Sequence, residues 1–274
     1  MRSDAEKRWS VHIMVDCGYH RDGVDPAEEE SVKLAKAISC GQACGRCAQR
    51  SWLQARPGAE AANRAYFQAT SLGGIYTHAG HSYDSKGQAD VVKVAEAERD
   101  AVASFAASLR QAGISCPTVG VGSTPTASHP PSNLSGCNEL HPGNYLCYDW
   151  MQHLIGSCAS DDIAVRVAAR VIGHNQKLNF MLIDLGWTGC TTQGAEHSFG
   201  HIMNHPALKV KKLKQEAGEV VSTDGSAIDF SRYPIGSMLL LAPWHACAAI
   251  SCHSKLHAVR GEQVLSQWNS VKGW

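Results

Sequence analysis

His245 and Cys247 offer metal-ligand chemistry at a spacing of two residues. They lie in an apolar run that predicts a β-strand, and alternate residues of a strand point to the same face. Because imidazole nitrogen and thiolate sulfur both bind zinc, the pair would form half of a zinc site completed by water or substrate. The alternative is a partly buried histidine beside a buried cysteine, and the pair taken alone favours this second interpretation.

Three further cysteines, Cys40, Cys44 and Cys47, lie close together in the segment CGQACGRC. The last two have the C-x-x-C spacing of metal and redox sites. A structural zinc site needs four ligands, and no second C-x-x-C follows at a suitable distance. We therefore favour a loop with incidental thiols over a metal cluster.

Three glycine-containing loops carry groups that suit a cofactor. Residues 75–83 hold two tyrosines and two histidines, which would stack on or hydrogen-bond to a planar ring. Residues 120–126 follow a predicted strand, and their backbone N–H groups and hydroxyls would hold a phosphate, although the P-loop pattern is absent. Residues 141–145 form a turn or a binding loop. For the last two segments a plain turn is the alternative.

The sequence predicts that the elements positioning these loops form an α/β region. Residues 9–16 and 117–122 predict strands, 27–38 and 88–112 predict helices, and 144–149 is a further strand candidate. From about residue 160 short apolar runs with turns between them predict a mostly β region, which includes the segment around His245. We expect one domain over 1–155 and a second over 156–274, with 40–70 as an atypical insert.

Composition excludes several classes of function. The 274 residues are 44% hydrophobic and 18% charged, with 25 basic and 25 acidic side chains, so a nucleic-acid or anionic-membrane partner is disfavoured. No apolar run approaches the length of a bilayer span, and residues 1–10 lack the apolar core of a signal peptide. The 11 cysteines are an odd number, which favours reduced thiols in a cytoplasmic protein over a disulfide framework.

Seven segments taken together resemble one family, the eukaryotic-type D-serine dehydratases, which have the alanine-racemase-like fold and are related to D-threonine aldolases. The resemblance covers residues 9–24 and 71–274, and the final VLSQWNSVKGW also fits it. The segments occur in the family's order: GIYTHAGHSY, VGVGSTPT, ELHPGNYLCYD, ARVIGH, FMLIDLGWTG, LKQEAGEV and PWHAC.

The resemblance implies part of a TIM-type α/β barrel that binds pyridoxal 5′-phosphate, followed by a β-rich domain with a Zn²⁺ site. It implies a homodimer that acts on a small-molecule D-amino acid, D-serine, by β-elimination and releases pyruvate and ammonia. His245 and Cys247 match the family's zinc ligands, which reverses the interpretation of the pair alone, and Arg21 lies in a loop near the cofactor. The implied cofactor-binding residues are Tyr76, Tyr83, Ser123, Thr124, Gly143, Asn144 and Tyr145.

The sequence departs from the family in three places. No Pro-His-x-Lys segment with the Schiff-base lysine is present, so we expect the first barrel strands to be missing and assign no catalytic residue. Residues 40–70 have no counterpart that we recognise, and Ala217 stands where the family usually has histidine. Three functions stay open: D-serine dehydratase, a D-threonine aldolase-like lyase acting on another β-hydroxy D-amino acid, and an inactive homologue that binds only zinc, cofactor or a partner chain.

Overall fold

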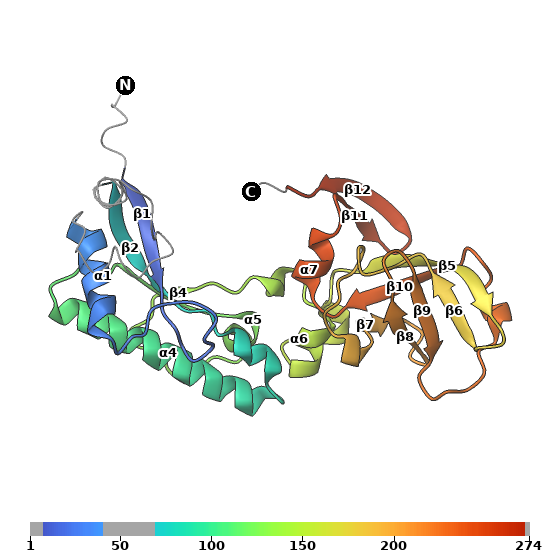
Figure 1. Ribbon diagram of the computed structural model, residues 1–274, viewed down its shortest axis with the longest axis horizontal. Coiled ribbons are helices and arrows are strands. Elements are labelled where there is room, and N and C mark those ends of the chain that lie inside the picture. The colour runs from blue at the N-terminus through green and yellow to red at the C-terminus, as the bar shows by residue number, and fades with distance from the viewer. Residues whose placement is uncertain (1–7, 41–68, 272–274) are drawn as a thin grey trace, which may run out of the picture. The chain divides into compact units, whose positions relative to one another are not determined.

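The computed structural model describes residues 8–40 and 69–271. The chain divides into two compact units, Met1–Gly143 and Asn144–Trp274 (Figure 1). Cys44, Cys47 and most of the expected 40–70 insert lie outside the described residues.

The first unit is built on a parallel sheet of four strands in the order β1-β2-β3-β4. A register shift between Val11 and His12 marks an irregularity in β1. Parallel pairing places the carboxyl ends of all four strands at one edge of the sheet. The strands are β1 (Trp9–Met14), β2 (Thr70–Tyr76), β3 (Thr118–Val121) and β4 (Glu139–Leu140).

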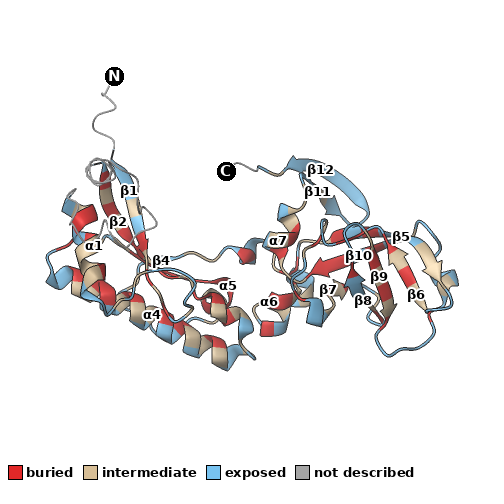
Figure 2. Ribbon diagram, in the orientation of Figure 1, coloured by how far each residue is buried: buried red, intermediate tan, exposed pale blue. Residues whose placement is uncertain are grey.

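Two helices pack on one face of this sheet, α1 (Glu29–Cys40) and α4 (Gln88–Gln111). Their buried side chains meet strand residues such as Ile13, Ile75 and Val119 in a common apolar core, visible as buried segments in Figure 2. The buried stripe of α4 recurs every three or four residues, as a helix with one face on a sheet requires. Two short helices follow strand ends, η2 (Gly80–Asp84) and α5 (Thr124–Ser128).

The second unit contains an antiparallel sheet of six strands in the order β7-β10-β5-β6-β9-β8. Alternation along β5 buries Val167, Ala169 and Val171 while the residues between them are exposed. Its strands are β5 (Val167–Asn175), β6 (Phe180–Ile183), β7 (Gly200–Ile202), β8 (Leu208–Leu213), β9 (Gly218–Ser222) and β10 (Met238–Pro243).

A hairpin and several short helices complete the second unit. The hairpin pairs β11 (Lys255–Arg260) with β12 (Gln263–Asn269), and β12 is exposed along its whole length (Figure 2). The helices are η3 (Asn144–Leu146), α6 (Trp150–Ile155), η4 (Ser160–Asp162), η5 (Ala195–His197), η6 (Phe230–Arg232) and α7 (Ala246–Ser251). Across the two described ranges, no helix is long and apolar enough to cross a membrane.

The structure confirms the strands predicted at 9–16 and 117–122 and the helices predicted at 27–38 and 88–112. The strand predicted at 144–149 is wrong, because this segment forms the short helix η3 and then the N-cap of α6. The units divide after Gly143, earlier than the boundary expected near residue 155.

Candidate functional site

Aromatic and histidine side chains gather at the carboxyl edge of the parallel sheet. Tyr76 ends β2, and its ring meets the ring of His141, just past β4, edge to face at 5.7 Å between centroids. His78 follows β2, and its Nδ1 lies 3.2 Å from the carbonyl oxygen of Gly122, which follows β3. Loops after three neighbouring strands therefore meet at this edge, where parallel α/β folds place their active sites.

Two glycines make room for these side chains. A Cβ at Gly120 would lie 3.1 Å from Oε1 of Glu139, 3.2 Å from Cδ2 of His141 and 3.4 Å from Cβ of Tyr76. Gly122 has a φ of +150°, and a Cβ there would lie 3.1 Å from the backbone nitrogen of His141. Side chains at either position would push apart the groups that converge here.

Tyr19, in the loop after β1, extends the cluster. Its ring stacks on His81 at 5.8 Å, and the guanidinium of Arg21 lies 5.2 Å from the Tyr19 centroid. Within the described part of the chain, no hydrogen-bond partner reaches two buried imidazole nitrogens, Nδ1 of His81 and Nε2 of His141. Because buried polar atoms are usually paired, these two nitrogens suit contact with a ligand. Burial lowers the pKa of His78, although the carbonyl of Gly122 opposes that shift.

Ser123 and Thr124, both predicted to bind a cofactor, are buried at the start of α5. Ser123 is the N-cap, and its hydroxyl accepts a hydrogen bond from the backbone N–H of Thr126. In return, the Thr126 hydroxyl accepts one from the Ser123 N–H at 3.0 Å. Both polar groups of Ser123 thus have protein partners, as in a capping box.

Tyr83 and Gly143 also belong to the first unit. Tyr83 lies on η2 with its ring 6.3 Å from that of His78, so it adjoins the cluster at the strand ends. Gly143 is the last residue of the unit, and a Cβ there would meet open space.

A buried carboxylate, Asp149, organises the candidate site of the second unit. As the N-cap of α6, its Oδ1 accepts the backbone N–H of Gln152 at 2.9 Å. Its Oδ2 accepts the side-chain amide of Asn144 at 2.5 Å and the backbone N–H of Ala246 at 2.8 Å. Asp149 therefore joins the start of α6 to the start of α7, which lies 97 positions later in the sequence.

His245 and Cys247 flank this junction, but the prediction that they share a strand face is wrong. β10 ends at Pro243, His245 is the extended N-cap residue of α7, and Cys247 lies in the first turn of that helix. His245 is half-buried and Cys247 is exposed. The two predicted ligands thus come from a strand-to-helix turn rather than from one strand.

Burial and the nearby carboxylate set the electrostatics of the pair. Burial lowers the pKa of His245, while the negative charge of Asp149 acts in the opposite direction. Although Cys247 is exposed as a whole residue, partial desolvation of its thiol raises the thiol pKa, and Asp149 and Cys147 add to that rise. Burial raises the pKa of Asp149 itself, although its three hydrogen bonds favour the charged form.

Three buried polar atoms near Asp149 could still form hydrogen bonds with a ligand or with water. Oδ1 of Asn144 and both amide atoms of the Gln152 side chain are buried, with no hydrogen-bond partner among the described residues. Tyr145, next to Asn144, is 47% exposed. In the described ranges, no group of three or more His, Cys, Asp or Glu side chains is arranged to hold a metal. His245 and Cys247 remain a predicted pair of ligands, and an open coordination site is typical of catalytic metals.

Comparison with known proteins identifies relatives of this chain. The family model described as "Putative serine dehydratase domain" matches residues 164–259. D-serine dehydratase of Dictyostelium discoideum is 32% identical over 285 aligned residues, which cover 99% of this chain and 66% of the relative. The chain is a homologue of D-serine dehydratases over nearly its whole length. D-threo-3-hydroxyaspartate dehydratase of Delftia sp. (strain HT23) is 34% identical, covering 74% of this chain and 57% of that protein.

Solved structures agree on the fold. An alanine racemase-like protein from Idiomarina loihiensis is 27% identical with a TM-score of 0.78, covering 97% of this chain and 66% of that one. A cysteine-to-alanine variant of D-threo-3-hydroxyaspartate dehydratase, in its metal-free form, is 29% identical with the same TM-score and the same coverage. The predicted alanine-racemase-like α/β fold with a β-rich C-terminal part is therefore confirmed. The chain spans from 57% to 66% of the length of its first curated relatives.

Sequence reasoning missed the two buried carboxylates. Glu98 occupies a core position of the α4 stripe, and a charge at such a position is a readable signal. Asp149 was hidden by the wrong strand prediction, because an acid followed by a short apolar helix is an N-cap pattern only once the helix is recognised.

Proposed function

We propose that this protein is a pyridoxal-phosphate-dependent dehydratase that converts a small β-hydroxy D-amino acid, with D-serine as the first candidate, into a 2-oxo acid and ammonia. One observation carries the proposal: similarity to a D-serine dehydratase extends over 99% of the chain. The cluster at the strand ends and the pair His245 and Cys247 both lie inside that region. A homodimer is part of the proposal and is tested by light scattering of the purified protein.

The residues at the strand ends fit a planar, anionic cofactor. The rings of Tyr76 and His141 offer an aromatic wall, Gly120 keeps the space beside them clear, and two buried imidazole nitrogens are unpartnered within the described chain. Bound pyridoxal phosphate would supply the electron acceptor that acidifies the substrate α-proton. Ser123, Thr124, Gly143, Asn144, Tyr145 and Tyr83 remain proposed contacts to its phosphate or ring.

No catalytic lysine is assigned. The described lysines of the first unit are Lys33, Lys36, Lys86 and Lys93, and none of them lies on a strand. We therefore limit this chain's part in the reaction to binding the cofactor, orienting it and holding a metal.

The donor set of the second unit fits a zinc ion. An imidazole and a thiolate are common zinc ligands, and a metal ion would ease departure of the substrate hydroxide as a Lewis acid. In solved D-threo-3-hydroxyaspartate dehydratase variants, the replaced histidine and cysteine are also two positions apart, and the cysteine variant is metal-free. Asp149 would orient the α7 turn that carries both ligands, as outer-shell carboxylates do.

The test is pyruvate release from D-serine by protein expressed from its complete reading frame, followed with lactate dehydrogenase and NADH. We expect turnover that needs added pyridoxal phosphate, falls with a zinc chelator and returns with Zn²⁺. A matched control uses L-serine, which should give no pyruvate. A fully loaded, folded protein that releases no 2-oxo acid would refute the dehydratase and leave an inactive homologue.

A second substrate has specific support. D-threo-3-hydroxyaspartate dehydratase is 34% identical over 216 residues, so a β-hydroxy D-amino acid with a second carboxylate is a reasonable alternative. Oxaloacetate formation from D-threo-3-hydroxyaspartate at a higher kcat/KM than pyruvate formation from D-serine would favour it. Release of glycine and acetaldehyde from D-threonine would instead indicate an aldolase.

A further inference from the structure

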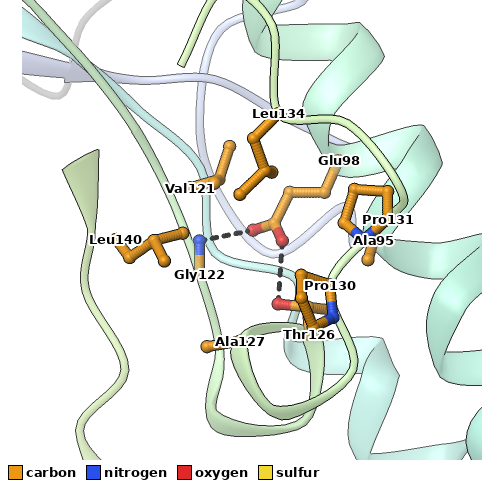
Figure 3. A pocket seen from close by; sticks show the side chains of 10 residues that line it. All are labelled: Ala95, Glu98, Val121, Gly122, Thr126, Ala127, Pro130, Pro131, Leu134 and Leu140. Carbon is orange, nitrogen blue, oxygen red and sulfur yellow. Dashed lines mark hydrogen bonds between the residues drawn. The ribbon is translucent and has the colours of Figure 1, made fainter. Parts of the chain in front are cut away.

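Glu98 is a buried carboxylate beneath the strand-end edge. Its residue is 1% exposed, on the face of α4 that packs against the sheet. The carboxylate lines a small pocket among mostly apolar side chains, including Val121, Pro130 and Leu134 (Figure 3). Burying a charge is costly unless every lone pair finds a donor, so the partners of Glu98 indicate its purpose.

Four donors converge on this carboxylate. Oε1 accepts from the hydroxyl of Thr77 at 2.9 Å, the N–H of Ala79 at 3.2 Å and the N–H of Gly122 at 3.0 Å. Oε2 accepts from the hydroxyl of Thr126 at 2.9 Å, and the bonds to Gly122 and Thr126 are drawn in Figure 3. Hydrogen bonds to an ionised acceptor are about twice as strong as neutral ones.

The four donors come from two different loops. Thr77 and Ala79 belong to the loop after β2, which also carries His78 and His81. Gly122 and Thr126 belong to the loop after β3 and to α5. Glu98 is thus a shared anchor for the two strand-end loops.

The Thr126 bond also fixes the capping box. Its hydroxyl has a single proton, which Oε2 of Glu98 accepts, so its oxygen accepts from the N–H and the hydroxyl of Ser123, each at 3.0 Å. The Ser123 hydroxyl also lies 2.8 Å from that of Ser82 on η2. A chain of three hydroxyls therefore runs from the β2 loop through the β3 loop and ends on Glu98.

We propose that Glu98 is a positioning residue that holds these two loops in the geometry required to bind the cofactor. The inference rests on the proposed function, because the loops are its proposed cofactor contacts. The positioning role predicts a change in cofactor affinity that is opposite in sign to the change expected from charge alone. Removing a negative charge near an anion site should tighten anion binding by Coulomb's law, whereas losing the anchor should weaken it.

The test measures binding of pyridoxine 5′-phosphate by quenching of tryptophan fluorescence. This probe has an alcohol in place of the aldehyde, so it cannot react with surface lysines. In Glu98→Gln the amide oxygen can still accept three bonds, but the amide nitrogen faces Thr126 and reverses the hydroxyl chain. We expect affinity about tenfold weaker, and a smaller loss in the same direction for Thr126→Val.

Two controls separate positioning from a general loss of stability. Glu96→Gln, an exposed change on the same helix, should bind like the wild type. Phe105→Leu, a core change on α4, should lower the melting temperature and leave affinity within about twofold. Hydrogen exchange should speed up in residues 77–82 and 122–127 of Glu98→Gln and stay unchanged in β8 and β9.

The outcomes distinguish this inference from the proposed function. Wild-type protein that does not bind the probe would overturn both. If wild type binds and Glu98→Gln binds equally well or more tightly, only the positioning role is overturned. If affinity falls in Phe105→Leu as much as in Glu98→Gln at equal loss of melting temperature, the effect is general destabilisation and the inference also fails.

Discussion

Replacing Asp149 should both destabilise the second unit and remove its metal. Asp149 is fully buried and accepts three hydrogen bonds from the start of α6, the start of α7 and the side chain of Asn144. In Asp149→Ala, three buried donors lose their acceptor. A buried donor left unpaired costs about 1–3 kcal/mol, so three of them predict a loss of about 3–9 kcal/mol in unfolding free energy.

That loss is a large part of a domain's usual stability of about 5–15 kcal/mol, so the milder Asp149→Asn is needed as well. The asparagine keeps one acceptor oxygen but turns an amide nitrogen toward donors. We expect a loss of about 1–3 kcal/mol with the fold retained. The metal content of this folded variant should be well below the wild-type value, because the turn that carries His245 and Cys247 loses its anchor.

Urea unfolding followed by tryptophan fluorescence is a suitable assay, since Trp150 starts α6 and Trp244 precedes His245. The matched control is Asp161→Ala, an exposed acid of the same unit, with an expected effect below about 0.5 kcal/mol. If the unfolding free energy of Asp149→Ala is less than about 1 kcal/mol below that of the wild type, the reasoning is refuted. An Asp149→Asn protein with full metal content would refute it as well.

Three further predictions concern single positions. His245→Ala and Cys247→Ala should each lose bound zinc by mass spectrometry of the purified protein, and full zinc in both would contradict the ligand assignment. Gly120→Ala should cost about 1–3 kcal/mol in urea unfolding, since its Cβ would lie within 3.4 Å of three side chains, and a neutral result would mean that the cluster is looser than described. Burial, with nearby His153, lowers the pKa of His201, so the unfolded chain binds more protons and stability should fall as the pH drops through about 6.5. His201→Gln should flatten that dependence of melting temperature on pH, and an unchanged profile would exclude His201 as a source.

The sequence predicts the helices and strands well where periodicity is strong. In α4 the apolar residues recur at helical spacing over 24 residues without Pro or Gly, and the helix is found where expected. The short apolar runs after residue 160 likewise predict a mostly β region, and β5 lies there. Such patterns are local, so they can be read without knowing which elements pack together.

Prediction from the sequence fails where contacts between distant segments determine the local structure. The run that ends in PWHAC is apolar throughout, and periodicity alone cannot show that the strand stops at Pro243 and a helix begins at Ala246. The N–H of Ala246 is held by Asp149, far away in the sequence, and that contact is invisible to local reading. The positions of His245 and Cys247 were found from residue type and family resemblance, whereas their geometry depends on this distant carboxylate.

The two buried carboxylates solve the same physical problem in the two units. Candidate ligands lie on loops and helix ends, where unpaired backbone N–H groups must find acceptors. Glu98 accepts from the loops after β2 and β3, and Asp149 accepts from the starts of α6 and α7. In each case one carboxylate accepts hydrogen bonds from two segments that are distant in sequence. It thereby holds together the segments that carry the candidate ligands, and an apolar residue could not replace it because such a side chain has no acceptor. For the first unit, Glu98 at a position where the α4 pattern calls for an apolar residue is therefore a better pointer to the site than the spacing of the candidate ligands.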